Sequence, residues 1–179
     1  MKTSFFSIIL FAFLFTTLSC SSNRAYLDPQ KTEQLLSSGN FSFNAERANP
    51  TNADVINVMN SFPGAGSSRM LTLDPGYTVD FSKEEINAQL PYFGRMFVAN
   101  MDTRKNGFDF KSKDFTIDKS RSTDKKTVFA VNVSDQSNIR QIFLEVFQNG
   151  RAYLSINAND RQAISYDGYI SETPKKSGE

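Results

Sequence analysis

The feature that most constrains the fold is the stretch 138–157, in which two apolar runs flank Asn149 and Gly150. Asn-Gly is the dipeptide best suited to a type I′ turn, because both central residues of that turn need positive φ. A two-residue loop here predicts a β-hairpin in which Phe147 faces Ala152. Both faces of this hairpin are largely apolar, which predicts a place in the middle of a sheet, with flanking strands and a second layer.

The rest of the chain predicts further short strands separated by polar turns. Phe129, Val131 and Val133 form the clearest apolar face outside the hairpin. Regular spacing of such segments is typical of an antiparallel meander. The predicted fold is therefore α+β and mainly β: an antiparallel meander sheet or a partly open barrel with one N-terminal helix packed against it. The other expected strands are 41–45, 69–73, 77–81, 86–90, 108–110, 115–119, 127–133 and 163–170.

The predicted helix begins at Asp28 and Pro29. Asp is a good N-cap, and Pro at the first helical position gives up a donor that has no partner there anyway. Leu35 and Leu36 would face the sheet, and Gly39 supplies the left-handed residue that ends a helix.

The segment 48–68 gives conflicting signals. Ile56, Val58 and Met59 have helical spacing, but interspersed Asn residues lower the helix propensity, and the string from Pro63 to Gly66 would end a helix. We expect an irregular insertion.

Residues 1–19 have the character of a signal peptide. Lys2 is followed by an apolar run that is too short to span a bilayer, since a spanning helix needs about 20 residues. The run ends in Thr17-Leu-Ser-Cys20, which resembles the lipobox of bacterial lipoproteins although Thr17 replaces the usual aliphatic residue. We expect a lipid at Cys20; the alternative is an ordinary cleaved signal with a leftover thiol. The expected organisation is signal 1–19, tether 20–28, one β-rich domain 29–171 and tail 172–179.

The expected mature chain has balanced charge. Lys2 is the only charged residue before Cys20, so equal numbers of basic and acidic residues remain. Nothing in this balance favours nucleic acid or an anionic surface as a partner, and we expect no nucleic-acid binding. A lone cysteine allows no internal disulfide, so stability must come from packing. The sequence leaves the oligomeric state open.

Four strings resemble recurring motifs of the domain of unknown function 4251 family. They are Leu35–Phe43, Leu90–Arg95 with the sequence Leu-Pro-Tyr-Phe-Gly-Arg, Phe147–Gly150, and Asn159–Ser165 followed by Gly168–Ile170. The resemblance covers roughly residues 32 to 170. It implies a secreted or lipid-anchored protein of Bacteroides-type bacteria, with no established activity.

Catalytic and metal chemistry find little support in the sequence. The chain has no histidine, which removes the usual general base and the commonest transition-metal ligand. Cys20 is committed to the anchor. We therefore expect no catalytic residue, no metal site and no cofactor. The alternative is a hydrolase acting on an envelope polymer through paired carboxylates, for which Asp80 with Glu84 or Asp114 with Asp118 are the candidates.

Three partial motifs match known sites poorly. Ser122-Thr-Asp-Lys125 reads S-x-x-K, but it lies in a charged turn rather than at the start of a buried helix. Residues 102–109 resemble the first half of a calcium loop, but Arg104 occupies a ligand position, and Lys113 stands where the loop's bidentate Glu should follow. The glycines at 64–66 lack the lysine of a phosphate-binding loop. We interpret all three as plain loops.

Two segments remain as candidate binding elements. Tyr92, Phe93 and Arg95 follow a strand end, where aromatic and Arg side chains often anchor a peptide or a glycan. Arg161 lies in a polar loop after the hairpin that could receive a partner. The alternative is structural: the rings cap the core, and the loop 159–162 closes a turn through its own hydrogen bonds.

The predicted function is a cell-envelope lipoprotein that acts as a non-enzymatic binding or structural module. Its partners would be the membrane, through the lipid on Cys20, and an envelope protein or a glycan. Residues 21–24 lack the acidic cluster expected to direct a lipoprotein to the cell surface. The predicted location is therefore the outer membrane, facing the periplasm.

Overall fold

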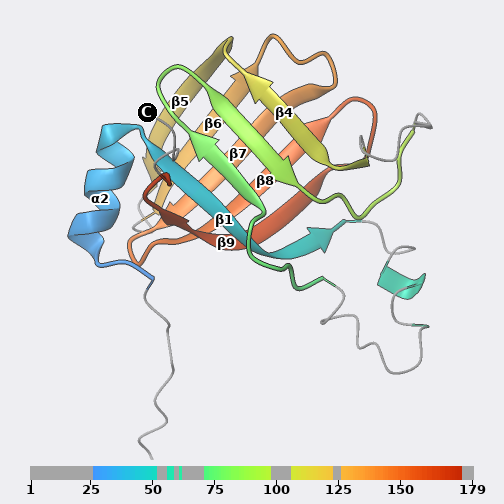
Figure 1. Cartoon of the computed structure of the whole chain (residues 1–179), viewed down its shortest axis with the longest axis horizontal. Coiled ribbons are helices and arrows are strands. Elements are labelled where there is room, and N and C mark those ends of the chain that lie inside the picture. The colour runs from blue at the N-terminus through green and yellow to red at the C-terminus, as the bar shows by residue number, and fades with distance from the viewer. Residues whose placement is uncertain are drawn as a thin grey trace, which may run out of the picture.

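The computed structural model describes residues 26–51, 56–58, 61, 71–97, 106–122 and 126–174, with side chains at 121 and 122 left out. Within these ranges, nine antiparallel strands form one sheet that curves into a nearly closed barrel (Figure 1). The strand order is β4-β3-β2-β1-β9-β8-β7-β6-β5. The predicted fold class, with an N-terminal helix against the sheet, is confirmed. The strands are β1 (Phe41–Pro50), β2 (Thr78–Phe81), β3 (Ile86–Leu90), β4 (Phe108–Ser112), β5 (Phe115–Ser122), β6 (Lys126–Val133), β7 (Ile139–Phe147), β8 (Arg151–Ala158) and β9 (Ile164–Ser171).

Helix α2 (Pro29–Ser38) has the predicted ends. The Asp28 carboxylate accepts a hydrogen bond from Gln30 N at 3.0 Å, and Gly39 takes φ +71°. Leu35 and Leu36 are buried in the core, as their spacing predicted. The chain then turns directly into β1, so that α2 lies at one end of the barrel while β1 ends at the other (Figure 1).

The hairpin of β7 and β8 exists, but its predicted register is wrong by one residue. Val146 pairs with Ala152, where the two-residue loop had placed Phe147. The loop has three residues, 148–150: Gly150 N donates to Phe147 O at 3.0 Å, and Gly150 has φ +79°. This combination is typical of a turn completed by a left-handed glycine that forms a bulge.

The corrected register separates the hairpin's two faces. The aliphatic side chains face the barrel interior and are buried, while the other face is partly exposed rather than covered by a second layer. The predicted place of the hairpin inside the sheet is confirmed, since β6 and β9 flank it. The inward residues are Ile142, Leu144, Val146, Ala152, Leu154 and Ile156.

Aromatic side chains fill the interior across the barrel. Phe41 on β1 stacks on Phe81 of β2, with ring centroids 5.1 Å apart. It also meets Phe129 of β6 at 5.9 Å, although β1 and β6 are not neighbours in the sheet. Phe129, Val131 and Val133 are buried as predicted. Contact between opposite walls leaves one packed core inside the barrel.

The two edge strands, β4 and β5, follow each other in the chain without pairing. The turn between them is held by Asp135 of the β6–β7 loop, which accepts from Ser112 Oγ at 2.6 Å and from Lys113 N at 2.8 Å. These hydrogen bonds, with that of Ser112 first, hold the pKa of the Asp135 carboxyl below its usual range. The Asp135 side chain, from the connection between β6 and β7, thus fixes the turn that joins the two edge strands.

The expected insertion 48–68 starts later than predicted, because β1 continues to Pro50. Its glycine-rich part and residues 69 and 70 lie outside the described residues. The short strand expected at 69–73 is reduced to one bridge, Thr72 with Arg47, flanked by Ala48 N to Leu71 O at 2.8 Å and Leu73 N to Glu46 O at 2.8 Å.

Candidate functional site

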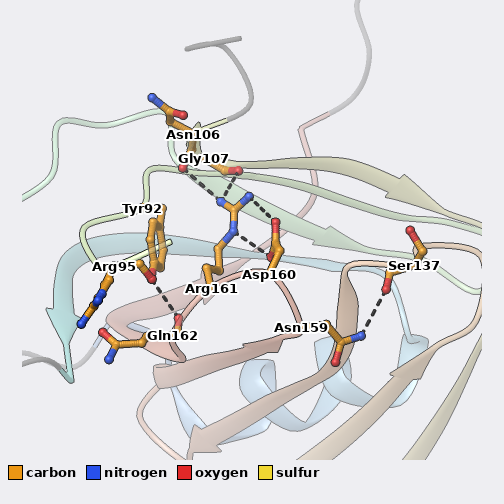
Figure 2. Close-up of polar contacts among 9 residues, drawn as sticks. All are labelled: Tyr92, Arg95, Asn106, Gly107, Ser137, Asn159, Asp160, Arg161 and Gln162. Atoms are coloured by element: carbon orange, nitrogen blue, oxygen red, sulfur yellow. Dashed lines mark hydrogen bonds and ion pairs between the residues drawn. The ribbon is translucent and has the colours of Figure 1, made fainter. Parts of the chain in front are cut away.

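The two predicted binding segments lie side by side at the barrel end away from α2. Beyond β3, the chain forms a bridge between Met96 and Arg161. Phe97 N donates to Asp160 O at 2.8 Å, and Gln162 N donates to Arg95 O at 3.1 Å. Segments about 65 positions apart in the sequence therefore form one unit, which we call the Arg161 cluster: residues 91–97, 106–107 and 160–162, with Phe108 and Tyr166. Figure 2 shows its polar contacts around Arg161 and Tyr92.

The centre of this cluster is the Arg161 side chain, which is only 3% exposed. Its Nε and Nη2 donate to the two carboxylate oxygens of Asp160 at 3.1 and 2.9 Å. Its Nη1 donates to the carbonyl oxygens of Asn106 and Gly107 at 3.1 and 3.0 Å. A buried charge is tolerated only when paired and hydrogen-bonded, and this planar fork meets both needs.

Two aromatic rings enclose the guanidinium. Its central carbon lies 5.1 Å from the centroid of the Tyr92 ring and 5.0 Å from that of Phe108, distances typical of cation–π contacts. The two rings meet edge to face, with centroids 5.6 Å apart. Arg161 therefore joins the loop carbonyls on one side to the aromatic core on the other.

The Tyr92 hydroxyl contacts backbone carbonyls of both segments, 91–97 and 160–162. It lies 2.9 Å from Arg95 O and 3.1 Å from Gln162 O, and its single proton can serve either carbonyl. Burial raises the pKa of Tyr92, against the opposing effects of the Gln162 hydrogen bond and the Arg161 charge. Gly94 leaves room for this hydroxyl, since a Cβ there would overlap it. The phenol stays neutral and acts as a donor.

Tyr166 connects the Arg161 cluster to the sheet. It lies on β9, fully buried, and its hydroxyl donates to Pro91 O at 2.7 Å. Burial strongly raises the pKa of this phenol. Both tyrosines thus hold carbonyls of the segment that follows β3. Because their pKa values are raised, both phenols keep their protons near neutral pH, and neither can act as a base there.

The structure brings only some of the predicted site residues together. Tyr92 and Arg161 are in contact, and Phe93 is half-buried against the core. The guanidinium beside the Tyr92 ring belongs to Arg161, whereas the expected neighbour, Arg95, is exposed and contributes its carbonyl. Figure 2 shows the Arg95 side chain directed away from Arg161. Tyr92 and Arg161 thus contact each other and backbone carbonyls within the fold, as expected if their role is structural.

Sequence reasoning missed two features of the cluster. The carbonyls of Asn106 and Gly107 carry no sequence signal as Arg ligands, because any residue has one. Phe97 is 61% exposed, more than any other large apolar side chain of the described residues. An aromatic residue after the Leu-Pro-Tyr-Phe-Gly-Arg string reads as core, so its exposure could not be foreseen.

The hydrogen bonds of Asn159 in the loop 159–162 run to a neighbouring connection, whereas the structural alternative expected the loop's own hydrogen bonds to close it. Asn159 N donates to Asn138 O at 2.9 Å, and Asn159 Nδ2 donates to Ser137 O at 3.1 Å. These bonds attach the loop to the connection before β7 (Figure 2).

The other sequence candidates do not assemble into a site. Lys125 and the start of the calcium-like loop lie outside the described residues, as do the glycines at 64–66 and Cys20. Asp80 accepts from buried Ser42 at 2.5 Å, while Glu84 is exposed in the next turn. In the described ranges, no three metal-ligating side chains gather, and no helix is both long and apolar enough to cross a membrane.

Comparison with known proteins gives a family and a fold neighbour. The model of the family described as Domain of unknown function (DUF4251) matches residues 24–170. A crystal structure of a DUF4251 family protein from Bacteroides eggerthii is similar with a TM-score of 0.47 and 12% identity, covering 80% of this chain and 87% of that one. No curated protein matches the chain. Because the family model spans most of the sequence, the chain belongs to the DUF4251 family.

Proposed function

We propose that this chain is a lipid-anchored, non-enzymatic binding module of the bacterial envelope. The lipid would be attached to Cys20, the domain would face the periplasm, and a partner protein would bind at the Arg161 cluster. The proposal rests on the lipobox-like string before Cys20, on the envelope location that the resemblance to the DUF4251 family implies, and on the geometry of this cluster.

One observation carries the binding role: an exposed aromatic side chain is held on a fixed backbone. Phe97 is exposed, yet its N–H is bonded to Asp160 O, and the neighbouring bridge to Arg161 fixes its position. Interface anchors are typically aromatic or Arg, and a preorganised anchor loses little entropy on binding. Exposed Arg95, two residues away, adds a cation of the kind that protein interfaces favour.

The chemistry of the cluster favours binding over catalysis. The Arg161 charge is balanced by Asp160, and the raised pKa values of Tyr92 and Tyr166 keep both phenols neutral. A general acid or base works best with a pKa near the operating pH. These groups are instead committed to holding carbonyls, which supports a rigid surface.

Site-specific photo-crosslinking in the native host tests the binding role. A photoreactive phenylalanine analogue at position 97 should give a discrete protein adduct. The matched control is position 117 on edge strand β5, where Ile117 is 42% exposed, and it should give none of that adduct. Adding Arg95→Ala should weaken the position 97 adduct while the melting temperature is unchanged. Equal adducts at both positions, or none at position 97, would overturn the binding of a partner protein at this site.

The anchor has its own test. Metabolic labelling with an alkyne fatty acid should tag the wild-type chain, and Cys20→Ala should remove both the label and the globomycin sensitivity of processing. Retained labelling in Cys20→Ala would refute the anchor. Protease treatment of intact cells should leave the domain whole if it faces the periplasm.

A further inference from the structure

The chain just before α2 is attached to the barrel. The backbone N–H groups of Tyr26 and Leu27 both donate to Asn149 O, each at 3.1 Å. The Tyr26 ring stacks on Tyr169 of β9, with centroids 4.7 Å apart and planes 6° from parallel. The Tyr26 hydroxyl donates to Glu46 Oε2 at 2.7 Å. Strands β1 and β9 and the β7–β8 turn therefore hold a residue that the sequence had placed in the tether.

Leu27 packs beneath the β7–β8 turn. A Cβ added to Gly150 would lie 2.9 Å from Leu27 Cβ, so the glycine and the leucine are in tight contact. Leu27 is among the partly buried side chains packed on the core. We call Tyr26 and Leu27 the docking segment. It fixes the point and direction at which the chain enters the fold.

Few residues separate Cys20 from this point in the sequence. Six Cα–Cα steps separate Cys20 from Tyr26, which span at most about 22 Å when fully extended. The barrel is longer than this reach: the seven steps of β8 from Arg151 to Ala158 rise about 23 Å. The Arg161 cluster lies beyond the far end of β8, opposite the turn at 148–150.

We propose that the docking segment orients the anchored barrel, with the β7–β8 turn toward the lipid headgroups and the Arg161 cluster pointing away from the membrane. The proposal rests on the lipid at Cys20 proposed above and deepens it. Phe147, 40% exposed beside the turn, and exposed Arg151 then lie at the end of the barrel that faces the bilayer. The partner surface around Phe97 would be presented to the periplasm at the full height of the barrel.

Energy transfer from a single tryptophan tests this orientation. The chain has no Trp, so Phe147→Trp and Phe97→Trp each introduce one donor. The lipidated proteins would be reconstituted into phosphatidylcholine vesicles that contain dansyl-headgroup lipid. Transfer from Trp at position 147 should be several-fold more efficient than from position 97, because transfer falls steeply with distance. Equal or reversed efficiencies would overturn the orientation.

A spacer variant supplies the matched control. A flexible Gly-Ser insertion between Ser22 and Asn23 lengthens the reach without touching the docking segment, so the two donors should become similar. If the insertion leaves the difference unchanged, tether length does not set the orientation, and this inference fails. Loss of vesicle binding in Cys20→Ala checks the anchor separately; a wild-type chain that carries no lipid and does not bind vesicles would instead refute the proposed function.

Discussion

The two ends of the barrel are stabilised by different interactions. At the end near α2, Gly150, Leu27 and Tyr26 pack through a tight turn, apolar contact and stacked rings. At the other end, one buried cation, Arg161, joins backbone carbonyls and a carboxylate from segments far apart in the sequence. The first end depends on shape and backbone conformation, and the second on satisfying a buried charge.

The difference teaches where each end is vulnerable. A packing contact that is trimmed loses roughly the energy of the atoms removed, and its neighbours can relax. A buried ion pair that loses one partner leaves an uncompensated charge and unpaired carbonyls, for which relaxation offers little relief. We therefore expect the Arg161 end to be the more sensitive to a single substitution.

The largest effect is expected for Arg161→Met. It keeps much of the side-chain volume but removes the charge, leaving Asp160 without its cation and the Asn106 and Gly107 carbonyls without this donor. We expect a loss of about 3–5 kcal/mol in the free energy of unfolding, measured by denaturant titration. Arg95→Met, the same change at an exposed position, should stay within about 0.5 kcal/mol. Similar losses for both would remove the distinction between the ends.

The second-largest effect is expected at Gly150, where a comparison with Gly39 separates backbone strain from steric overlap with Leu27. Gly150→Ala places a Cβ at φ +79° and against Leu27, whereas Gly39→Ala meets a similar φ, +71°, with only ordinary contact to the Lys83 side chain. Backbone strain of about 1–3 kcal/mol is common to both, so an excess at Gly150 measures the Leu27 contact. Gly150→Val should be worse than Gly150→Ala. A melting temperature unchanged in Gly150→Val would contradict the left-handed turn.

The smallest effect is expected for Tyr92→Phe, which keeps the ring on Arg161 and removes one hydrogen-bond donor. We expect a loss of about 1 kcal/mol at neutral pH. Because the pKa of Tyr92 is raised on folding, its contribution is fully present below the ordinary tyrosine pKa of about 10 and is lost as the pH rises through the folded value. The variant should lose less stability than the wild type on alkaline titration. If the stabilities of the wild type and the variant fall in parallel as the pH rises, the ionisation of Tyr92 does not contribute to the alkaline loss of stability.

The hairpin shows how far the sequence leads and where it misleads. Asn149-Gly150 predicted a turn, and the turn exists with Gly150 at positive φ. The two-residue loop was wrong because the same dipeptide also suits a three-residue loop that ends in a left-handed glycine. A signal for the correct register was present: only the three-residue loop pairs Leu144 with Leu154 and Ile142 with Ile156, which places the aliphatic side chains on one face.

The candidate site was less predictable than the strands. The sequence singled out Tyr92 and Arg161 as separate residues, but not their contact. Arg161 and the Asn106 carbonyl are 55 positions apart, and no pattern in the chain relates them. Phe97, the side chain that we propose as an anchor, had no signal at all.

Local chemistry thus determined what the sequence alone could fix: a helix between Asp28 and Gly39, the strand alternation, and a turn at Gly150. Each depends on residues within a few positions, where backbone dihedrals and side-chain periodicity act directly. Tertiary structure alone decided which polar side chain would be buried and which aromatic exposed. Those outcomes depend on what lies within a few ångströms after distant strands have assembled. Arg161, from a polar loop, therefore became the centre of a buried cluster, while Arg95, from an aromatic string, remained in solvent.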